Sequence, residues 1–247
     1  MLVDSVKPSV IVNAAAWTDV DGAETNESDA HAVNALGPKN LALAAKEVGS
    51  KFVQVSTDYV FSGEATTPWS ENSFHNPRSV YGSTKSDGEK LVLDAHPSGS
   101  YVVRTAWLYS AERKNFAKTM TKLALNGDGE VRVVKDQMGQ PTFTGDLAKQ
   151  IVDLVLSVAP VGVYHGTNSG QATWFEFAQE IFKLSGTDVR RVIPVSSSEY
   201  PRPAKRPSYS VLGHDAWAKT TVEPMRDWRI ALAKAMPTII NAVKAEG

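Results

Sequence analysis

The chain of 247 residues contains no cysteine, and this absence excludes several kinds of chemistry. Without thiols there is no disulfide framework, no zinc site built on cysteine and no cysteine nucleophile. The absence is compatible with a reducing cytoplasm, where we expect the protein to be located. The five histidines are scattered. No two of them have metal-ligand spacing on one predicted element, so we expect no histidine-based metal site.

Long apolar runs and a strong charge of one sign are also missing. No run approaches the roughly 18 apolar residues needed to cross a bilayer, and no basic start followed by an apolar segment indicates a signal peptide. The 26 basic and 27 acidic side chains are interspersed and give a net charge of −1. We therefore expect no nucleic-acid or membrane surface. A chain of this length forms one large domain, or one domain with a smaller partner.

Short apolar runs alternate with helical patterns along the chain, which predicts an α/β fold. The runs at 10–12 and 52–55 are typical of strands buried on both faces, and a helical pattern between them ends at Gly49. Strand, helix and strand in this order predict a parallel sheet with a right-handed crossover. Further strands are expected at 101–105, 130–134 and 161–166, and helices at about 28–34, 37–48, 79–95, 115–125, 146–158, 174–184 and 228–244.

The strongest chemical pattern is Tyr81 with Lys85, four residues later on a predicted helix. Residues at this spacing share one face, and an ammonium beside a phenol makes the phenol easier to ionise. Thr57, at the end of the strand over 52–55, adds a hydroxyl that can hydrogen-bond a carbonyl oxygen. The three side chains could protonate a ketone oxygen while hydride arrives at its carbon. Taken alone, Tyr-x-x-x-Lys is more often a solvated pair.

Other candidates follow neighbouring strands of the predicted sheet. In open α/β sheets the carboxyl ends of the strands carry the ligand. Ala16, Trp17 and Thr18 come after the first strand, where small residues let a ligand lie against the backbone, although a plain tight turn also explains them. Asp58 follows Thr57. Trp107 follows the strand over 101–105 and is either a core residue or a plate on which a sugar stacks, and its position favours the second.

A basic loop over 192–209 contains four prolines together with Arg202, Lys205 and Arg206. Arginine forks match phosphate oxygens, so such a loop could hold a diphosphate. A solvated surface loop explains the composition equally well, and the sequence leaves both interpretations open.

Six motifs in a fixed order resemble the dTDP-4-dehydrorhamnose reductases, a family of extended short-chain dehydrogenase/reductases that act on nucleotide sugars. The likeness covers almost the whole chain. The combination of Ser-Thr-Asp-Tyr-Val-Phe, at the end of the second predicted strand, with Tyr-Gly-x-x-Lys is specific to the family. The motifs are 12–18 (VNAAAWT), 33–35 (VNA), 56–61 (STDYVF), 81–85 (YGSTK), 104–109 (RTAWLY) and 136–142 (DQMGQPT).

The resemblance implies a Rossmann-like parallel sheet with helices on both faces. It also implies a dinucleotide-binding domain over 1–160 and a smaller, intertwined substrate-binding region over 161–247. The implied reaction is reduction of dTDP-4-dehydro-6-deoxy-L-mannose to dTDP-L-rhamnose by NADPH or NADH, in dTDP-rhamnose and cell-surface polysaccharide biosynthesis. The preferred nicotinamide cofactor, a homodimer and an interface Mg²⁺ stay open.

The resemblance also implies roles for individual residues. Tyr81 would protonate the C4 oxygen, and Lys85 would lower the pKa of Tyr81 and bond the nicotinamide ribose. Thr57 would bond the substrate carbonyl. Asp58 and Trp107 would contact the sugar, and Ala16, Trp17 and Thr18, together with Tyr81 and Lys85, would contact the cofactor.

One departure from the family pattern concerns the start of the sequence. The family begins with a strand, a Gly-rich turn that cradles the cofactor pyrophosphate, and a helix. No such turn follows a strand near Met1. We therefore expect a βαβ segment of about 30 residues to be missing. We also expect the chain to be a truncated reductase whose own activity is in doubt.

Two other functions compete with the reductase. A non-catalytic nucleotide-binding subunit on the same fold, like a regulatory subunit of methionine adenosyltransferase, would have no chemical need for Thr57, Tyr81 and Lys85. An epimerase or dehydratase acting on a nucleotide sugar is disfavoured, because a dehydratase pairs its Thr with two carboxyl residues. Here Asp58 is followed by Tyr59 and no Glu.

Overall fold

The computed structural model describes residues 2–246, and its contacts divide the chain into two compact units. The expected boundary at residue 160 differs from this division, because residues 151–166 supply a strand to the sheet of the first unit. Each unit is assembled from three separated segments, so the units interleave along the chain. The first unit comprises Met1–Thr105, Ile151–Gly166 and Arg202–Glu223, and the second comprises Ala106–Gln150, Thr167–Pro201 and Pro224–Gly247.

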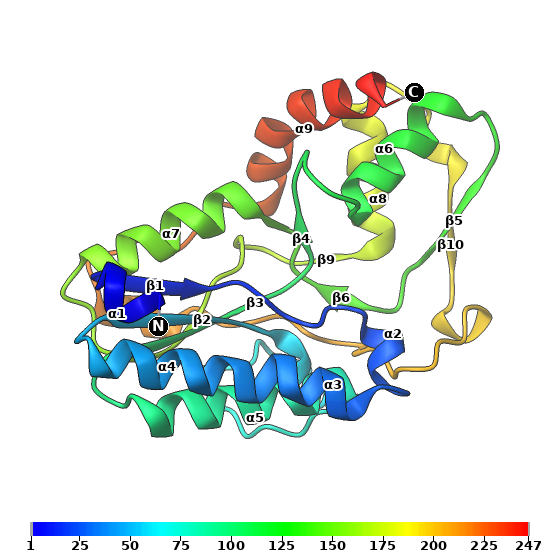
Figure 1. Cartoon of the computed structure of the whole chain (residues 1–247). Helices are drawn as coiled ribbons and strands as arrows, with labels where there is room; N and C mark the ends of the chain where they lie inside the picture. The colour runs from blue at the N-terminus through cyan, green and yellow to red at the C-terminus, as the bar shows by residue number, and fades with distance from the viewer. Residues whose placement is uncertain (1, 247) are drawn as a thin grey trace. The chain divides into compact units, whose positions relative to one another are not determined.

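A four-stranded parallel sheet in the order β1-β2-β3-β8 organises the first unit (Figure 1). The parallel sheet predicted from the apolar runs is confirmed. Asn13 of β1 pairs with Gln54 of β2, and Thr57 of β2 pairs with Thr105 of β3. Because all four strands run the same way, the residues that follow them emerge at one edge of the sheet. The strands are β1 (Val10–Asn13), β2 (Lys51–Thr57), β3 (Ser100–Thr105) and β8 (Gly162–His165).

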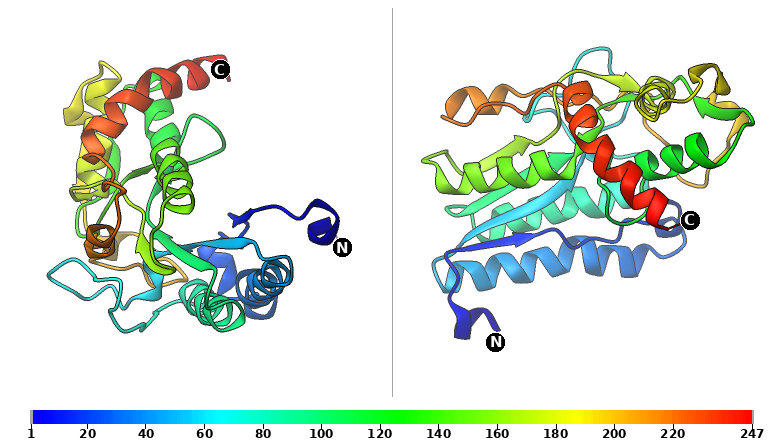
Figure 2. Two further views of the ribbon diagram at one scale, coloured as in Figure 1. Left: turned by 90° about the vertical axis from the view of Figure 1, so that its left-hand side faces the viewer. Right: turned by 90° about the horizontal axis from the view of Figure 1, so that it is seen from above.

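Helices α4 and α5 cover one face of this sheet, and the last turns of α7, residues 151–156, lie over the other (Figures 1 and 2). Ala42 and Ala45 of α4 pack on Phe52 of β2 and Val92 of α5 in a fully buried cluster. The helical elements with residues in this unit are α1 (Leu2–Val6), α2 (Val20–Ala23), α3 (Glu27–His31), η1 (Ala32–Leu36), α4 (Gly37–Glu47), η2 (Asp58–Val60), α5 (Val80–Ala95), α7 (Thr144–Leu156) and η5 (Asp215–Lys219).

The residues from 27 to 47 form one continuous helix, where the sequence predicted two helices with a restart at Gly37. A single π-helical turn, η1, joins α3 to α4. Pro38 has no N–H for the regular bonding pattern, and the wide turn before it absorbs the missing bond. The short helix α2 is capped at its N-terminus by Asp19, whose side chain accepts the N–H of Gly22.

Two glycines of α5 allow the helix to approach its neighbours closely. A Cβ at Gly82 would lie 2.2 Å from the carbonyl oxygen of Tyr59, and a Cβ at Gly88 would lie 2.1 Å from that of Asn34. Glycine inside a helix is normally unfavourable, so steric need explains it here. The close approach brings the helix face that carries Tyr81 against the end of β2.

The second unit has three short two-stranded ladders within residues 106–246 and an apolar core under helices α6, α8 and α9. Val192–Val195, predicted as part of a loop, forms β10 parallel to β5. Pro194 is tolerated because β10 has a partner on one side. The helix predicted over 174–184 is confirmed as α8, and it begins with a capping box formed by Thr173 and Glu176. The elements are β4 (Leu108–Tyr109), α6 (Phe116–Asn126), β5 (Val131–Val134), β6 (Met138–Gly139), β7 (Thr142–Phe143), β9 (Ala172–Thr173), α8 (Trp174–Leu184), η3 (Val189–Arg191), β10 (Val192–Val195), η4 (Ser197–Glu199), α9 (Trp228–Ala245) and the start of α7.

Among residues 2–246, no helix combines the length and the apolar character that a membrane span requires.

Candidate active site

The end of β2 and the first turns of α5 bring the predicted catalytic side chains together. Thr57 is the last residue of β2, and its hydroxyl accepts the N–H of Tyr59 at the start of η2. Ser79 caps the N-terminus of α5, because its side chain accepts the N–H of Gly82. The helix therefore begins at Val80, one residue before Tyr81. The Thr57 side chain lies close enough to Tyr81 to act on the pKa of its phenol.

Tyr81 is a phenol that this environment keeps protonated. Burial raises its pKa, the hydrogen bond to Thr57 lowers it, and the nearby Asp58 carboxylate raises it. The sequence had predicted a lowered pKa through Lys85. The difference arises because the groups that act on the phenol are those at the β2 end, while the ammonium of Lys85 is directed elsewhere. Tyr81 is therefore built to hold a proton.

Lys85 is 3% exposed, and its Nζ donates to the backbone carbonyl of Val55 at 2.7 Å. Burial lowers its pKa to about 8, and the Glu89 carboxylate opposes this shift. The lysine is one helical turn beyond Tyr81 and points at β2 two residues before Thr57. The helix thus places a phenol and an amine along one short stretch of strand.

Asp58 is a buried carboxyl group next to Thr57, and the Thr57 hydroxyl donates to it at 2.9 Å. Burial raises its pKa to about 6, and hydrogen bonds from Ser210 and Thr57 reduce the rise. Near neutral pH the group is an acceptor for hydroxyls, which suits a carboxylate that holds a sugar.

Tyr59 and Arg206 extend this cluster. The sequence assigned Tyr59 no role of its own, and it placed Arg206 in a loop that either holds a diphosphate or is solvated. The ring of Tyr59 meets that of Tyr81 edge-on, with centroids 5.5 Å apart. Arg206 Nη1 donates to the Tyr59 hydroxyl at 3.4 Å, and Arg206 Nη2 forms an ion pair with Asp21 at 2.9 Å. Burial raises the pKa of Tyr59 to about 12. The position of Tyr59 two residues after Thr57, within the strand-end motif, was the signal available in the sequence.

The segment after β1 is held by Asn34 of η1. The Oδ1 atom of Asn34 accepts the N–H of Trp17 at 2.9 Å, and its Nδ2 donates to Thr84 Oγ1 at 3.1 Å. Asn34 therefore braces the segment after β1 against α5. Ala16 and Trp17 are half-buried and Thr18 is exposed, so their backbone is accessible at the same sheet edge as Thr57.

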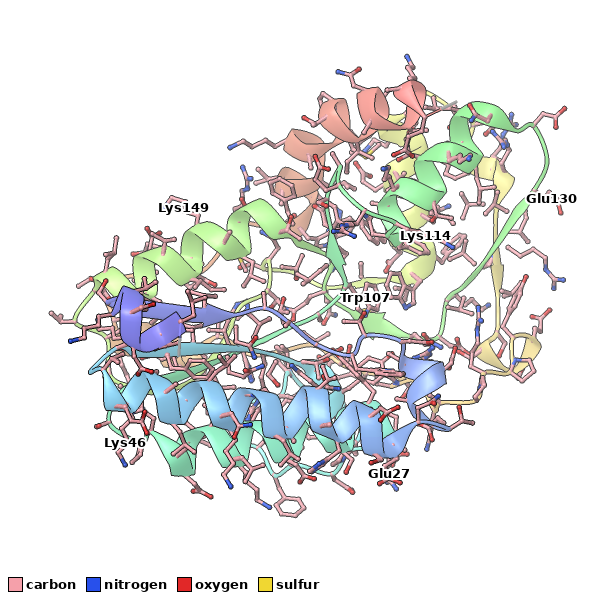
Figure 3. The ribbon with its side chains drawn as sticks, viewed as in Figure 1. Glu27, Lys46, Trp107, Lys114, Glu130 and Lys149 are labelled. Carbon is pink, nitrogen blue, oxygen red and sulfur yellow. The ribbon has the colours of Figure 1, made fainter. Side chains whose placement is uncertain are left out.

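Trp107 belongs to the second unit and follows β3 (Figure 3). Its ring stacks on that of Trp174 at a centroid distance of 3.6 Å, and its backbone has a φ of 46°. A Cβ at Gly139 would lie 2.6 Å from the Trp107 ring. The ring therefore has close neighbours within this unit, and the strained φ indicates a residue held in place by its surroundings.

The site residues fall into three groups. Thr57, Asp58, Tyr81 and Lys85 meet at the end of β2. Ala16, Trp17 and Thr18 follow the adjacent strand in the same unit. Trp107 lies in the other unit. Arg202, Lys205 and Arg206 lie in the first unit, where Lys205 pairs with Glu64.

A parallel sheet whose strand end holds a threonine beside a helical tyrosine, with a lysine one turn later, is typical of the short-chain dehydrogenase/reductase class. The chain resembles in particular the crystal structure titled dTDP-4-dehydrorhamnose reductase from Bacillus anthracis in complex with NADP. The two are 37% identical, with a TM-score of 0.91 over 96% of this chain and 83% of that one.

Residues 1–240 match the family described as the RmlD substrate binding domain, and the chain belongs to this family. It is 47% identical over 237 residues to the dTDP-4-dehydrorhamnose reductase of Streptomyces griseus, covering 94% of this chain and 78% of that protein. It is also 47% identical over 237 residues to a probable dTDP-4,6-dihydroxy-2-methyloxan-3-one 4-ketoreductase of Streptomyces antibioticus, covering 96% and 80%.

Proposed function

We propose that this chain reduces the 4-keto group of a dTDP-linked 6-deoxy sugar, with hydride from NADPH or NADH. The substrate is dTDP-4-dehydro-6-deoxy-L-mannose and the product is dTDP-L-rhamnose, a precursor of cell-surface polysaccharides. The observation that carries the proposal is the meeting of the Thr57, Asp58 and Tyr81 side chains at the end of β2. The relatives named as dTDP-sugar reductases support it.

The raised pKa of Tyr81 fits a proton donor in the direction of reduction. The phenol is protonated at neutral pH, so it can give its proton to the C4 oxygen when that oxygen becomes an alkoxide. The phenolate left behind must then regain a proton, and Lys85, whose ammonium donates to the Val55 carbonyl, lies one helical turn away. Asp58 holds sugar hydroxyls as an acceptor.

A nicotinamide cofactor fits the residues that follow β1. Ala14 and Ala15 are exposed at the strand end, and nothing larger than a methyl group separates a ligand from the backbone there. Ala16, Trp17 and Thr18, with Tyr81 and Lys85, would hold the cofactor. When bound it supplies the hydride, and the chain supplies orientation and the proton. Such a reaction draws on cytoplasmic pools of cofactor and nucleotide sugar, so we place the protein in the cytoplasm.

The experiment compares the wild-type chain with Tyr81→Phe and with Tyr200→Phe, a control that removes the same hydroxyl from a residue that is 41% exposed. Purified protein is mixed with dTDP-4-dehydrorhamnose or dTDP-4-keto-6-deoxy-D-glucose and with NADPH or NADH, and loss of nicotinamide absorbance is followed. Calorimetry measures cofactor and substrate binding in parallel.

We expect Tyr81→Phe to lower kcat by about 10²–10⁴-fold while the dissociation constant for substrate changes little. Tyr200→Phe should match the wild type. Turnover by Tyr81→Phe at more than about a tenth of the wild-type rate would refute the role of the phenol. Turnover of dTDP-4-keto-6-deoxy-D-glucose alone would reassign the substrate within the same class.

A further inference from the structure

Beneath the candidate site lies a buried polar cluster that the reaction scheme above does not use. Its centre is Arg104 of β3, which is 2% exposed. The guanidinium donates to both carboxylate oxygens of Glu89, with Nη2 at 2.7 Å from Oε2 and Nε at 3.0 Å from each oxygen. Glu89, on α5, is also 2% exposed. A buried, fork-like ion pair of this kind is strongly oriented.

The remaining donors of Arg104 are also satisfied within the first unit. Nη1 donates to the backbone carbonyl of Glu71 at 3.0 Å and lies 3.3 Å from His165 Nε2. Nη2 lies 2.7 Å from His75 Nε2. Because arginine only donates, both imidazole nitrogens act as acceptors. Burial lowers the pKa of His75 and brings that of His165 to about 3, so both rings are neutral near pH 7.

Glu89 makes two further interactions, and both connect it to residues next to the candidate site. Its Oε1 accepts the hydroxyl of Ser56, the residue immediately before Thr57. It also lies four residues after Lys85 on α5, where its negative charge favours the lysine cation. Ser56 and Arg104 are register partners on β2 and β3, so Glu89 bridges the two strands from the helix.

Three residues of α5, each one turn apart, therefore contact the last three residues of β2. Tyr81 lies beside Thr57, Lys85 donates to the carbonyl of Val55, and Glu89 accepts the hydroxyl of Ser56. We propose that Glu89 is a positioning residue that keeps Lys85 a cation and fixes the end of β2 at Ser56, with Arg104 holding the Glu89 carboxylate in place. The consequence for catalysis depends on the proposed function, whereas the effect on Lys85 does not.

The charges that face this pair come from several elements. Arg104 on β3 is cationic, Lys90 is the next residue of α5, and His75 and His165 are neutral. In Glu89→Gln the anion beside Lys85 disappears while the Arg104 cation stays. Loss of this anion disfavours a protonated Lys85, so its titration midpoint must fall.

The test follows the titration of Lys85 directly, without turnover. Protein labelled with ¹³C at lysine Cε is titrated by NMR, and the Lys85 signal is assigned by its loss in Lys85→Arg. The wild-type midpoint is expected at about 8. Glu89→Gln should lower it by about 1 unit or more. Asp94→Asn is the matched control, because it removes one carboxylate from an exposed position of the same helix, and it should leave the midpoint unchanged.

Near-UV circular dichroism and thermal melting record the fold of each variant. A variant that loses stability while Lys85 titrates as in the wild type would reduce Glu89 to a structural residue and overturn the proposal. If Glu89→Gln does not fold, Glu89→Asp decides. The side chain of aspartate is one methylene shorter, so its carboxylate lies about one bond length farther from Lys85. The titration midpoint of Lys85 should therefore fall by a few tenths of a unit, and an unchanged midpoint refutes the proposal. If Tyr81→Phe kept its turnover, the proposed function would be refuted. The titration of Lys85 does not depend on turnover, so its result would still decide the role of Glu89.

Discussion

Replacing Gly82 by alanine tests whether α5 is pressed against the end of β2. Changing a glycine inside a helix to alanine normally stabilises the folded protein by up to about 1 kcal/mol, because alanine has the better helix propensity. At Gly82 the new Cβ would lie 2.2 Å from the Tyr59 carbonyl oxygen, whereas real Cβ atoms essentially never approach closer than 3.0 Å. The neighbour is backbone, so the helix itself must move.

Overpacking of this kind costs about 1–3 kcal/mol, and a clash of nearly 1 Å with backbone lies at the upper end. After the gain in propensity we expect a net destabilisation of about 2 kcal/mol. For a chain of this size, a loss of that magnitude lowers Tm by about 4–8 °C. The shift would also pull Tyr81 away from Thr57, so turnover should fall more than stability alone explains.

Thermal unfolding followed by circular dichroism measures the stability, and the reductase assay measures the turnover. Gly37→Ala is the matched control, because Gly37 is also helical and its nearest neighbour, the Ala32 carbonyl, would lie 3.5 Å from the new Cβ. That variant should be as stable as the wild type or slightly more so. If Gly82→Ala also raised Tm, the tight contact between α5 and Tyr59 would be refuted.

Two further substitutions probe the groups around the site. Asp58→Asn should raise stability at pH 7 by about 1–3 kcal/mol, because burial raises the pKa of Asp58 to about 6 and ionising it in the fold is unfavourable. Between about pH 4 and 6 the folded protein keeps Asp58 protonated while the unfolded chain does not. The gain in stability from Asp58→Asn should therefore be small at pH 4. An equal gain at pH 4 and pH 7, measured by chemical denaturation, would contradict this. Asn34→Ala should cost about 1–3 kcal/mol because the Trp17 N–H loses its acceptor and the Thr84 hydroxyl, which keeps the Tyr81 carbonyl, loses its donor. Faster proteolysis within 14–18 is the readout, and Asn26→Ala on the exposed helix start is its control.

The parallel sheet could be predicted because its signal is local. The apolar runs at 10–12, 52–55 and 101–105 became β1, β2 and β3, and each is flanked by the turn or helix that its neighbours indicate. Thr57, Tyr81 and Lys85 could be grouped for the same reason, since strand ends and helix periodicity place them without knowledge of distant contacts.

The elements that escaped prediction depend on distant partners. Val192–Val195 contains a proline and reads as a loop until its pairing with β5 is known. The direction of the Lys85 ammonium was also beyond the sequence, because the Val55 carbonyl that it meets is 30 residues away. Glu89 could have been noticed as the third member of the stripe at 81, 85 and 89, yet its meaning comes from Arg104, on another strand.

The π-helical turn at Ala32–Leu36 has a consequence for how this region tolerates change in length. Each residue of an α-helix advances the side chains by about 100° around the axis. The wide turn accommodates one extra residue, so the helix before and after it keeps the phase of a single α-helix, including Ala42 and Ala45 against Phe52. Removing one residue between 37 and 41, after the turn, would rotate the apolar face of α4 away from Phe52 and toward water. A helix that looks like a simple rod is in this way as intolerant of deletions as a strand whose alternation must be kept.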